Sequence, residues 1–261
     1  MIRQTLHAVI GTPYRTVCLA TLLLVTMVAI SAPPARAQDA VDPAERQRIE
    51  GIVHDYLMAN PEVILEAIRS MEERQQAAKE QQRDSIIDQV VPTLTASPLT
   101  PAFGADDSDV VMVEFFDYQC GYCKRLYPGV QKLMENDPKL KVIFAELPIL
   151  GPASLVAARA ALASQEQGKY MEFHDALMEH QGQLSDGVIF DLADEVGLDI
   201  DKLKVDMEAP KVMQYLAMIR SISDSLDIRG TPAMVIGKNF VGGYVPYEKL
   251  QEIVEQVRAE G

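Results

Sequence analysis

The sequence has few of the residues that cross-link small secreted proteins or bind metals, and it is short of basic residues. Its 261 residues include three cysteines and four histidines, and 24 basic side chains stand against 38 acidic ones. The net charge of −14 disfavours nucleic acids and anionic membrane surfaces as partners, because both repel an acidic chain. Hydrophobic residues make up 48% of the chain, which is enough for one domain of ordinary size with an extension.

The first 37 residues are typical of a secretory signal peptide. Arg3 and Arg15 come before an apolar run at residues 17–32, and these 16 residues are few for a membrane span. Ala35-Arg36-Ala37 then gives an A-x-A cleavage pattern. An uncleaved membrane anchor is the alternative. Cleavage would remove three basic and no acidic side chains, and it would leave a net charge of −17.

Only two cysteines, Cys120 and Cys123, would remain after cleavage, because Cys18 lies in the signal peptide. An exported protein meets an oxidising compartment, but a bridge that closes so small a loop adds little chain-entropy stabilisation. The pair is therefore poorly explained as a structural cross-link. Half a zinc site is the alternative, and it needs further ligands at metal spacing. The remaining chain offers three histidines: His54, His174 and His180.

No zinc site is predicted from these histidines. His174 shares an apolar helical face with Tyr170 and Leu177, where a core histidine is the more common role. Two soft thiolates can still bind copper(I), so that chemistry stays open. We predict no metal and no cofactor other than a redox-active disulfide between Cys120 and Cys123.

Residues 38–93 are expected to form a helical extension with a linker. Apolar residues recur at helical spacing in residues 49–57 and again in residues 63–71, whereas residues 72–85 are almost wholly polar. The polar stretch is either a linker or a solvated surface helix. The two apolar faces must pack on the main domain or on another subunit, so we expect a homo-oligomer through residues 45–85. Three prolines in residues 92–101 predict a connector.

The catalytic domain is expected to span residues 94–261. Strand patterns occur at residues 110–116, 141–147, 233–236 and 240–241, with helices at 124–134 and 247–259 and a helical insertion at about 152–227. This order combines a βαβ unit with a ββα unit. The predicted fold class is α/β: a thioredoxin fold with an inserted helical domain, preceded by the N-terminal helical extension. A C-x-x-C motif in a βαβ context is typical of thioredoxin-like redox proteins.

The spacing of the two thiols suits thiol–disulfide exchange. Such an exchanger needs an accessible thiolate and a second thiol that resolves the mixed disulfide. Cys120 would lie at a helix N-terminus, where free amides and the helix dipole lower a thiol pKa, so we expect it to attack. Cys123, one turn inside, would resolve. Gly121 and Tyr122 lie between them and are expected to tune the thiolate.

Three further residues fit this chemistry. Glu114 is an ionisable group in an apolar run, so a buried carboxyl with a raised pKa could exchange protons with Cys123. An edge-facing glutamate without a role is the alternative. Thr231 and Pro232 precede a strand, where a cis proline could leave neighbouring backbone free to pair with a substrate peptide. An ordinary turn proline is the alternative there.

Three motifs, FFDYQCGYCKR, LPILGPAS and GTPAMVIG, resemble the periplasmic DsbA-like family of thiol–disulfide oxidoreductases. The N-terminal IVHDYLMANPEVILEAI resembles the extension of ScsC-type (suppressor of copper sensitivity) and DsbC/DsbG-like members. The resemblance implies a thioredoxin fold, Cys120 as nucleophile, Cys123 as resolving thiol, and a cis Pro232 after Thr231. It places the family's buried acidic residue at Glu114. The common Pro-His dipeptide is replaced by Gly-Tyr.

The leading hypothesis is an exported, periplasmic protein disulfide oxidoreductase or isomerase. Its partners would be cysteine-containing exported proteins and a membrane redox partner that resets the pair, with no role for nucleic acid. The sequence leaves the direction open among oxidation, reduction and isomerisation. The alternative is a periplasmic copper(I)-binding or copper-tolerance protein that uses the same two thiolates.

Overall fold

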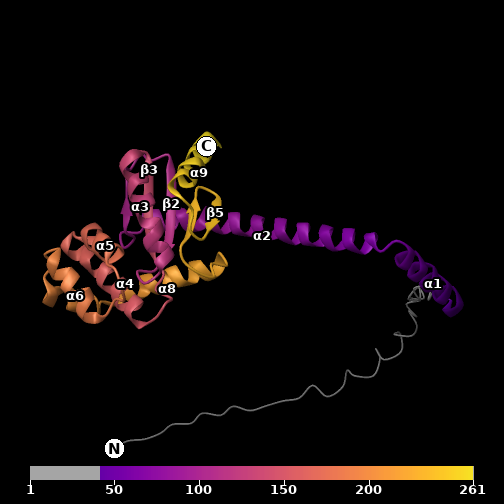
Figure 1. Ribbon diagram of the computed structural model, residues 1–261, viewed down its shortest axis with the longest axis horizontal. Coiled ribbons are helices and arrows are strands. Elements are labelled where there is room, and N and C mark those ends of the chain that lie inside the picture. Colours follow the sequence, from indigo (N-terminus) through magenta and orange to yellow (C-terminus); the bar gives the residue numbers. More distant parts are fainter. Residues whose placement is uncertain (1–41, 261) are drawn as a thin grey trace, which may run out of the picture. The chain divides into compact units, whose positions relative to one another are not determined.

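The computed structural model describes residues 42–260, and the predicted signal peptide at residues 1–37 lies outside them (Figure 1). The helices are α1 (Pro43–Ala59), α2 (Glu62–Ala96), α3 (Gly121–Asn136), α4 (Pro152–Ser164), the 3₁₀ helix η1 (Gln165–Gln167), α5 (Tyr170–Glu179), α6 (Asp186–Glu195), α7 (Ile200–Asp206), α8 (Pro210–Ser225) and α9 (Tyr247–Glu260). The strands are β1 (Ala102–Phe103), β2 (Val110–Phe116), β3 (Leu140–Glu146), β4 (Ala233–Ile236) and β5 (Asn239–Gly242). Within residues 42–260, no helix is both long and apolar enough to span a membrane.

Five strands form one mixed sheet in the order β1-β3-β2-β4-β5. Strands β2 and β3 run parallel because α3 crosses over between them, and the other neighbouring pairs are antiparallel. Helices α4 to α8 are inserted between β3 and β4 and gather beside the sheet in Figure 1. This arrangement confirms the thioredoxin fold with a helical insertion that the order of the sequence patterns predicts.

Side chains alternate between two buried faces of the sheet. On one, here called the α3 face, Met112 and Phe116 of β2 pack with Phe144 of β3 and with helices α3, α5 and α9. On the other, here called the α8 face, Val113 and Phe115 of β2 pack against α8 and the end of α2. Both faces of β2 are buried, which explains its nearly continuous apolar sequence.

Helix α2 continues through Pro92 to Ala96, so the domain boundary predicted at residues 93/94 lies inside a helix and the connector predicted from residue 92 is wrong at its start. Proline lacks the amide proton that the helix would use, and it normally ends or kinks a helix. Here Ile87 and Leu94 are buried on the α8 face on either side of Pro92. Tertiary packing therefore outweighs the local preference.

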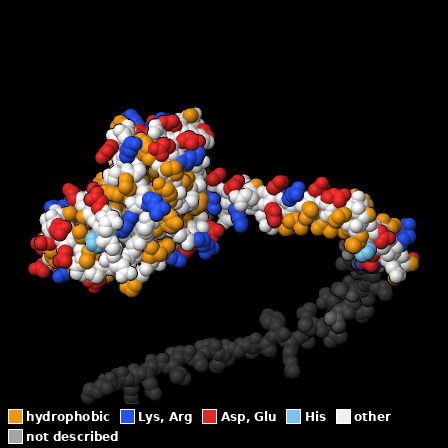
Figure 2. All heavy atoms as spheres, in the orientation of Figure 1, with side chains coloured by type: hydrophobic (Ala, Val, Ile, Leu, Met, Phe, Trp, Pro, Cys, Tyr) orange, Lys and Arg blue, Asp and Glu red, His pale blue; other side chains and the backbone are white. Residues whose placement is uncertain are grey.

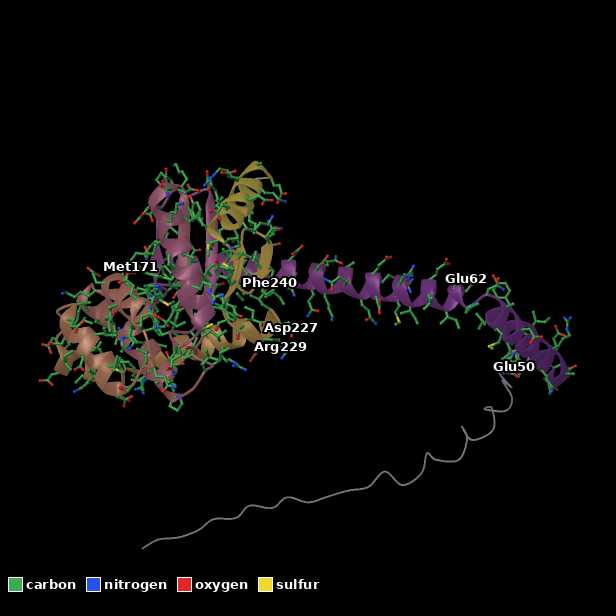
Figure 3. All side chains as sticks on the ribbon, viewed as in Figure 1. Glu50, Glu62, Met171, Asp227, Arg229 and Phe240 are labelled. Carbon is green, nitrogen blue, oxygen red and sulfur yellow. The ribbon has the colours of Figure 1, made fainter. Side chains whose placement is uncertain are left out.

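Two polar contacts add to this packing. The guanidinium of Arg83 lies 4.2 Å from the ring centre of Phe240 on β5, which Figure 3 labels. Lys238 forms an ion pair with Asp88 of α2 at 3.1 Å. The last part of α2 is thus a packed element of the same unit as the sheet.

The chain divides into two compact units within α2, after Glu66. Helix α1 has no buried residue. Figure 2 shows hydrophobic side chains along the first part of α2. The exposed large hydrophobic residues of these two helices are Ile49, Ile52, Val53, Tyr56, Met58, Ile64, Leu65, Ile68 and Met71. Most residues of the two apolar patterns in the sequence are therefore exposed within residues 42–260.

Candidate functional site

The site is centred on Cys120, the residue that caps the N-terminus of α3. Strand β2 ends at Phe116, and the next three residues form a turn in which the carbonyl of Asp117 accepts the amide of Cys120 at 2.9 Å. The carbonyl of Cys120 then accepts the amide of Lys124 at 3.0 Å, which is the first hydrogen bond of α3. The sulfur of Cys120 therefore lies beside the free amides at the N-terminus of α3.

The pKa of Cys120 is lowered to about 5. Hydrogen bonding with the Cys123 thiol is the largest cause. Burial comes next and acts in the opposite direction, and Thr231 and the amides of Cys123 and Tyr122 lower the pKa further. Because this pKa lies below neutrality, the reduced protein carries a Cys120 thiolate at pH 7. A thiolate is the attacking form in disulfide exchange.

Cys123 is fully buried and differs sharply from its neighbour. Its pKa is raised far above the ordinary thiol value, first by burial, then by the hydrogen bond to Cys120, and then by the charge of Glu114. Both cysteines are free thiols in this structure. The motif therefore pairs a thiol that readily loses its proton with one that strongly retains it.

Glu114 lies on β2 with 2% of its surface exposed, so the sequence-based alternative of an edge-facing residue is wrong. By strand alternation it shares the α3 face with Met112 and Phe116. Burial and the neighbouring Cys120 charge raise its pKa to about 8. Its Oε1 has no hydrogen-bond partner among the described residues. The carboxyl is therefore free to give or take a proton near neutral pH.

The loop before β4 closes the site from a distant part of the sequence. The Thr231–Pro232 peptide bond is cis. When Cys120 is a protonated thiol, its Sγ donates to the carbonyl oxygen of Thr231 at 3.2 Å, although the two residues are 111 positions apart. The fold thus brings together Cys120, Cys123, Glu114, Thr231 and Pro232.

Gly121 and Tyr122 lie at the surface of the site. A Cβ atom added to Gly121 would meet no atom within 4 Å, so this position has room for a side chain. Tyr122 is 58% exposed, and the guanidinium of Arg125 lies 5.1 Å from its ring centre and 5.8 Å from that of Tyr244. These side chains form an exposed aromatic and cationic rim beside Cys120.

The sequence analysis missed Asp117, which holds the turn at residues 117–119, here called the catalytic turn. The buried carboxylate of Asp117 accepts the amide of Gln119 at 2.8 Å and, across the site, the amides of Ile149 at 2.8 Å and Leu150 at 2.9 Å. The turn before Cys120 is therefore fastened to the loop after β3. An aspartate directly after a buried strand was the available signal, because aspartate commonly bonds nearby amides in turns.

A buried polar cluster beside the site was also missed. It consists of Tyr118, Glu146, Tyr170 and His174, and all four are fully or nearly fully buried. His174 is the core histidine that the sequence predicts, but its Nδ1 lies 3.0 Å from the hydroxyl of Tyr118. Within residues 42–260, no group of three or more histidine, cysteine or acidic residues is arranged to hold a metal ion.

Two family models match parts of this sequence. The model for the DSBA-like thioredoxin domain matches residues 111–255, which is more than half of the chain. A model for the N-terminal domain of the copper resistance protein ScsC matches residues 45–78. The chain belongs to the DSBA-like thioredoxin family.

Solved structures agree with this assignment. A thioredoxin-like oxidoreductase from Silicibacter pomeroyi DSS-3 is 42% identical, with a TM-score of 0.62, over 64% of this chain and 96% of that one. A linker-deletion variant of Proteus mirabilis ScsC is 27% identical, with a TM-score of 0.66, over 86% and 100%. The thiol-disulfide exchange protein alpha-DsbA2 from Wolbachia pipientis is 34% identical, with a TM-score of 0.64, over 69% and 98%.

One curated relative is much longer than the region it shares. A Na⁺/H⁺ antiporter, NhaA 1 of Salinispora arenicola, is 29% identical over 144 residues. That alignment covers 54% of this chain but only 22% of the antiporter. The chain therefore spans less than a quarter of the length of this relative.

Proposed function

We propose that this chain is an exported, periplasmic thiol–disulfide oxidoreductase that forms, reduces or isomerises disulfide bonds in cysteine-containing exported proteins. The opposite shifts of the two thiol pKa values are the observation that carries the proposal. Cys120 has a pKa of about 5, whereas that of Cys123 is raised far above its ordinary value. One thiol is thereby prepared to attack and the other to hold a proton until the resolving step.

The oxidising direction starts from a Cys120–Cys123 disulfide. A substrate thiolate attacks the Sγ of Cys120, and the bond between the two cysteines breaks. Cys123 leaves with the electron pair and takes a proton, which Glu114 supplies from its carboxyl group. A second substrate thiolate then attacks the substrate sulfur of the mixed disulfide and releases Cys120 as a thiolate. The substrate dithiol loses two electrons and the protein's cysteine pair gains them.

The loop at Thr231 and Pro232 is proposed to position the substrate. The carbonyl oxygen of Thr231 lies 3.2 Å from the Sγ of Cys120. An extended peptide that pairs with this backbone would present its own cysteine to Cys120. Backbone pairing accepts many sequences, which suits an enzyme that acts on many exported proteins.

Insulin reduction by purified protein tests the proposal. Wild type should accelerate precipitation of the insulin chains in the presence of a thiol reductant, and Cys120→Ser should not. Cys123→Ser is the matched variant, because it keeps the attacking thiol and should accumulate a mixed disulfide with the substrate. If metal-free, fully reduced wild type is inactive, the proposal is wrong.

We further propose that the uncovered apolar residues of α1 and the first part of α2 join copies of this chain. These side chains remain 43–71% exposed within residues 42–260, and burial against a second copy would remove them from water. An oligomer with several catalytic sites suits reshuffling of wrong disulfides, whereas a monomer suits oxidation of dithiols.

Light scattering on wild type, Ile52→Glu and Ile68→Glu tests this assembly. Both substitutions place a charge among the apolar residues and should yield monomers. Gln75→Glu is the control, because it adds the same charge at an exposed polar position of α2. Refolding of scrambled ribonuclease should fall with dissociation, while oxidation of reduced ribonuclease should persist. Wild type that remains monomeric at high concentration contradicts the oligomer.

Copper(I) binding is the second candidate function. The N-terminal match to a copper resistance protein favours it, and the two free thiols supply soft ligands. Insulin reduction in the presence of a copper(I) chelator separates the two functions. Full activity without copper supports exchange, whereas tight copper(I) binding without exchange supports metal handling.

A further inference from the structure

Four buried side chains form a hydrogen-bonded cluster that the exchange steps do not use. Glu146 is the last residue of β3, and its Oε1 accepts the hydroxyl of Tyr118 at 2.9 Å and the hydroxyl of Tyr170 at 2.9 Å. The Tyr118 oxygen also lies 3.0 Å from Nδ1 of His174. Tyr118 stands two residues before Cys120 in the catalytic turn, whereas Tyr170 and His174 lie on α5 of the helical insertion.

Proton counting assigns the donors in this cluster. Tyr118 has one hydroxyl proton, and it goes to Glu146, so His174 must donate its Nδ1 proton to the Tyr118 oxygen. His174 is neutral, because burial lowers its pKa to about 3. Its Nε2 is then unprotonated, and this atom has no hydrogen-bond partner among the described residues. The hydroxyl of Tyr118 is thus held from two sides.

Stability alone is a weak reason for such a cluster. Glu146 Oε2 and His174 Nε2 have no hydrogen-bond partner among the described residues. Buried polar groups that are only partly satisfied cost stability relative to apolar packing. Apolar residues of similar size would fill this part of the core more favourably. An incompletely satisfied cluster that includes a residue two positions before Cys120 therefore calls for a role in function.

The cluster joins three elements at one point. Tyr118 belongs to the turn that caps α3, Glu146 to the sheet, and the other two members to α5. The insertion touches the same region a second time, because Lys124, directly after Cys123, donates to the carbonyl of Leu177 on α5 at 2.9 Å. The position of the insertion is therefore mechanically linked to the catalytic turn.

We infer that Tyr118, held by Glu146 and His174, is a positioning residue that fixes the sulfur of Cys120 against the first amides of α3. This inference deepens the proposed function and rests on it for its biological meaning. The hydroxyl bonds hold the turn residues between Asp117 and Cys120 in one conformation. Loosening them lets the sulfur move away from the groups that stabilise its thiolate, since those hydrogen bonds depend on position.

Tyr118→Phe and Tyr170→Phe form a matched pair for the test. Each keeps its ring and removes one hydroxyl bonded to the same Glu146 oxygen at 2.9 Å. The pKa of Cys120 is measured from the ultraviolet absorbance of its thiolate against pH. Tyr118→Phe should raise this pKa by about half to one unit, which is a roughly threefold to tenfold change in the ionisation constant. Tyr170→Phe should leave it unchanged, although both variants lower the melting temperature.

Equal shifts in the two variants, or no shift in Tyr118→Phe, overturn the inference and leave the cluster a structural one. If circular dichroism shows that Tyr118→Phe does not fold, His174→Phe decides, because it removes the second bond to the Tyr118 oxygen. A raised pKa of Cys120 is expected there, and an unchanged one contradicts the inference. The titration needs no substrate, so failure of wild type in insulin reduction would count against the proposed function and not against this assignment.

Discussion

The two apolar faces of the central sheet differ in one respect although they share the same strands: only one of them carries buried carboxyl groups. On the α8 face, Val113 and Phe115 of β2 lie beside Ile143 and Ala145 of β3, and all four are apolar. On the α3 face, the same strands carry the buried carboxyl groups of Glu114 and Glu146. The residues of β2 and β3 on the α8 face therefore contribute to stability by apolar packing. On the α3 face, burial of two ionisable groups near a reactive thiol lowers the free energy of unfolding.

Removal of the sulfur of Cys120 should have the largest effect. Cys120→Ser should abolish insulin reduction, because a serine hydroxyl is not ionised at neutral pH and cannot form the mixed disulfide. Its free energy of unfolding should change little, since the side chains are similar in size. Cys123→Ser is the control in a mixed-disulfide assay, where it should form the adduct but not release it. Residual turnover by Cys120→Ser would assign the nucleophile to another group.

The second prediction compares neighbouring phenylalanines that point to opposite faces. Phe115→Ala and Phe116→Ala should each lose about 3 to 5 kcal/mol of unfolding free energy in urea titrations, because both leave a cavity in a packed core. Only Phe116→Ala should also shift the pKa of Cys120. The Phe116 ring lies 5.1 Å from the rings of both Tyr118 and His174, whereas Phe115 packs on the α8 face.

A pKa shift in Phe115→Ala equal to that in Phe116→Ala would mean that general loosening, and not the chemistry of one face, controls the thiolate. Both variants should be titrated well below their melting temperatures. Circular dichroism at each pH confirms that the folded state is the one being measured.

Much of the α3 face could be predicted from sequence because its signals are local. Cys120 and Cys123 stand three residues apart after a strand pattern, and Glu114 is the one charged residue in that strand. The bounds of β2, Val110–Phe116, agree with the apolar run. Each of these features depends on residues within about ten positions, the range in which periodicity and motif spacing carry information.

The cluster around Tyr118 has no such local signal. Its hydrogen bonds join residues 24, 28 and 56 positions apart, so only the folded chain brings them together. Helical periodicity predicts that Tyr170 and His174 share a buried face, but it says nothing about partners from β3. The continuation of α2 through Pro92 fails for a similar reason, because long-range burial of Leu94 decides it.

The third prediction tests whether Glu114, on the α3 face, transfers protons. In the reducing direction, Cys123 must lose its proton before it can resolve the mixed disulfide. Glu114→Gln keeps the shape of the side chain but cannot take that proton, so resolution should slow by roughly a hundredfold. Attack by Cys120 should be nearly unaffected. Stopped-flow measurement of formation and decay of the adduct separates the two steps. Equal slowing of both would indicate displaced thiols instead of a lost proton acceptor.

The raised pKa of Glu114 also predicts how the stability of the reduced protein depends on pH. Its pKa is raised to about 8 in the folded state from 4.5, so the folded protein favours the protonated form. The contribution of this group to stability is fully present below pH 4.5 and is lost as the pH rises through about 8. Urea titrations should show that Glu114→Gln loses this pH dependence. An unchanged dependence would show that other groups cause it.

The smallest expected effect comes from the exposed rim of the site. Tyr122→His places a titratable ring directly before Cys123, and a histidine cation there should stabilise the Cys120 thiolate. At pH 6 the equilibrium with glutathione should move toward the reduced protein by about threefold to tenfold. At pH 8 the ring is neutral and the effect should fade. Tyr122→Phe is the control, because it keeps a ring beside Arg125 without a basic group. An effect of Tyr122→His that is as large at pH 8 as at pH 6 would mean that the lost tyrosine, and not the added charge, changes the thiolate.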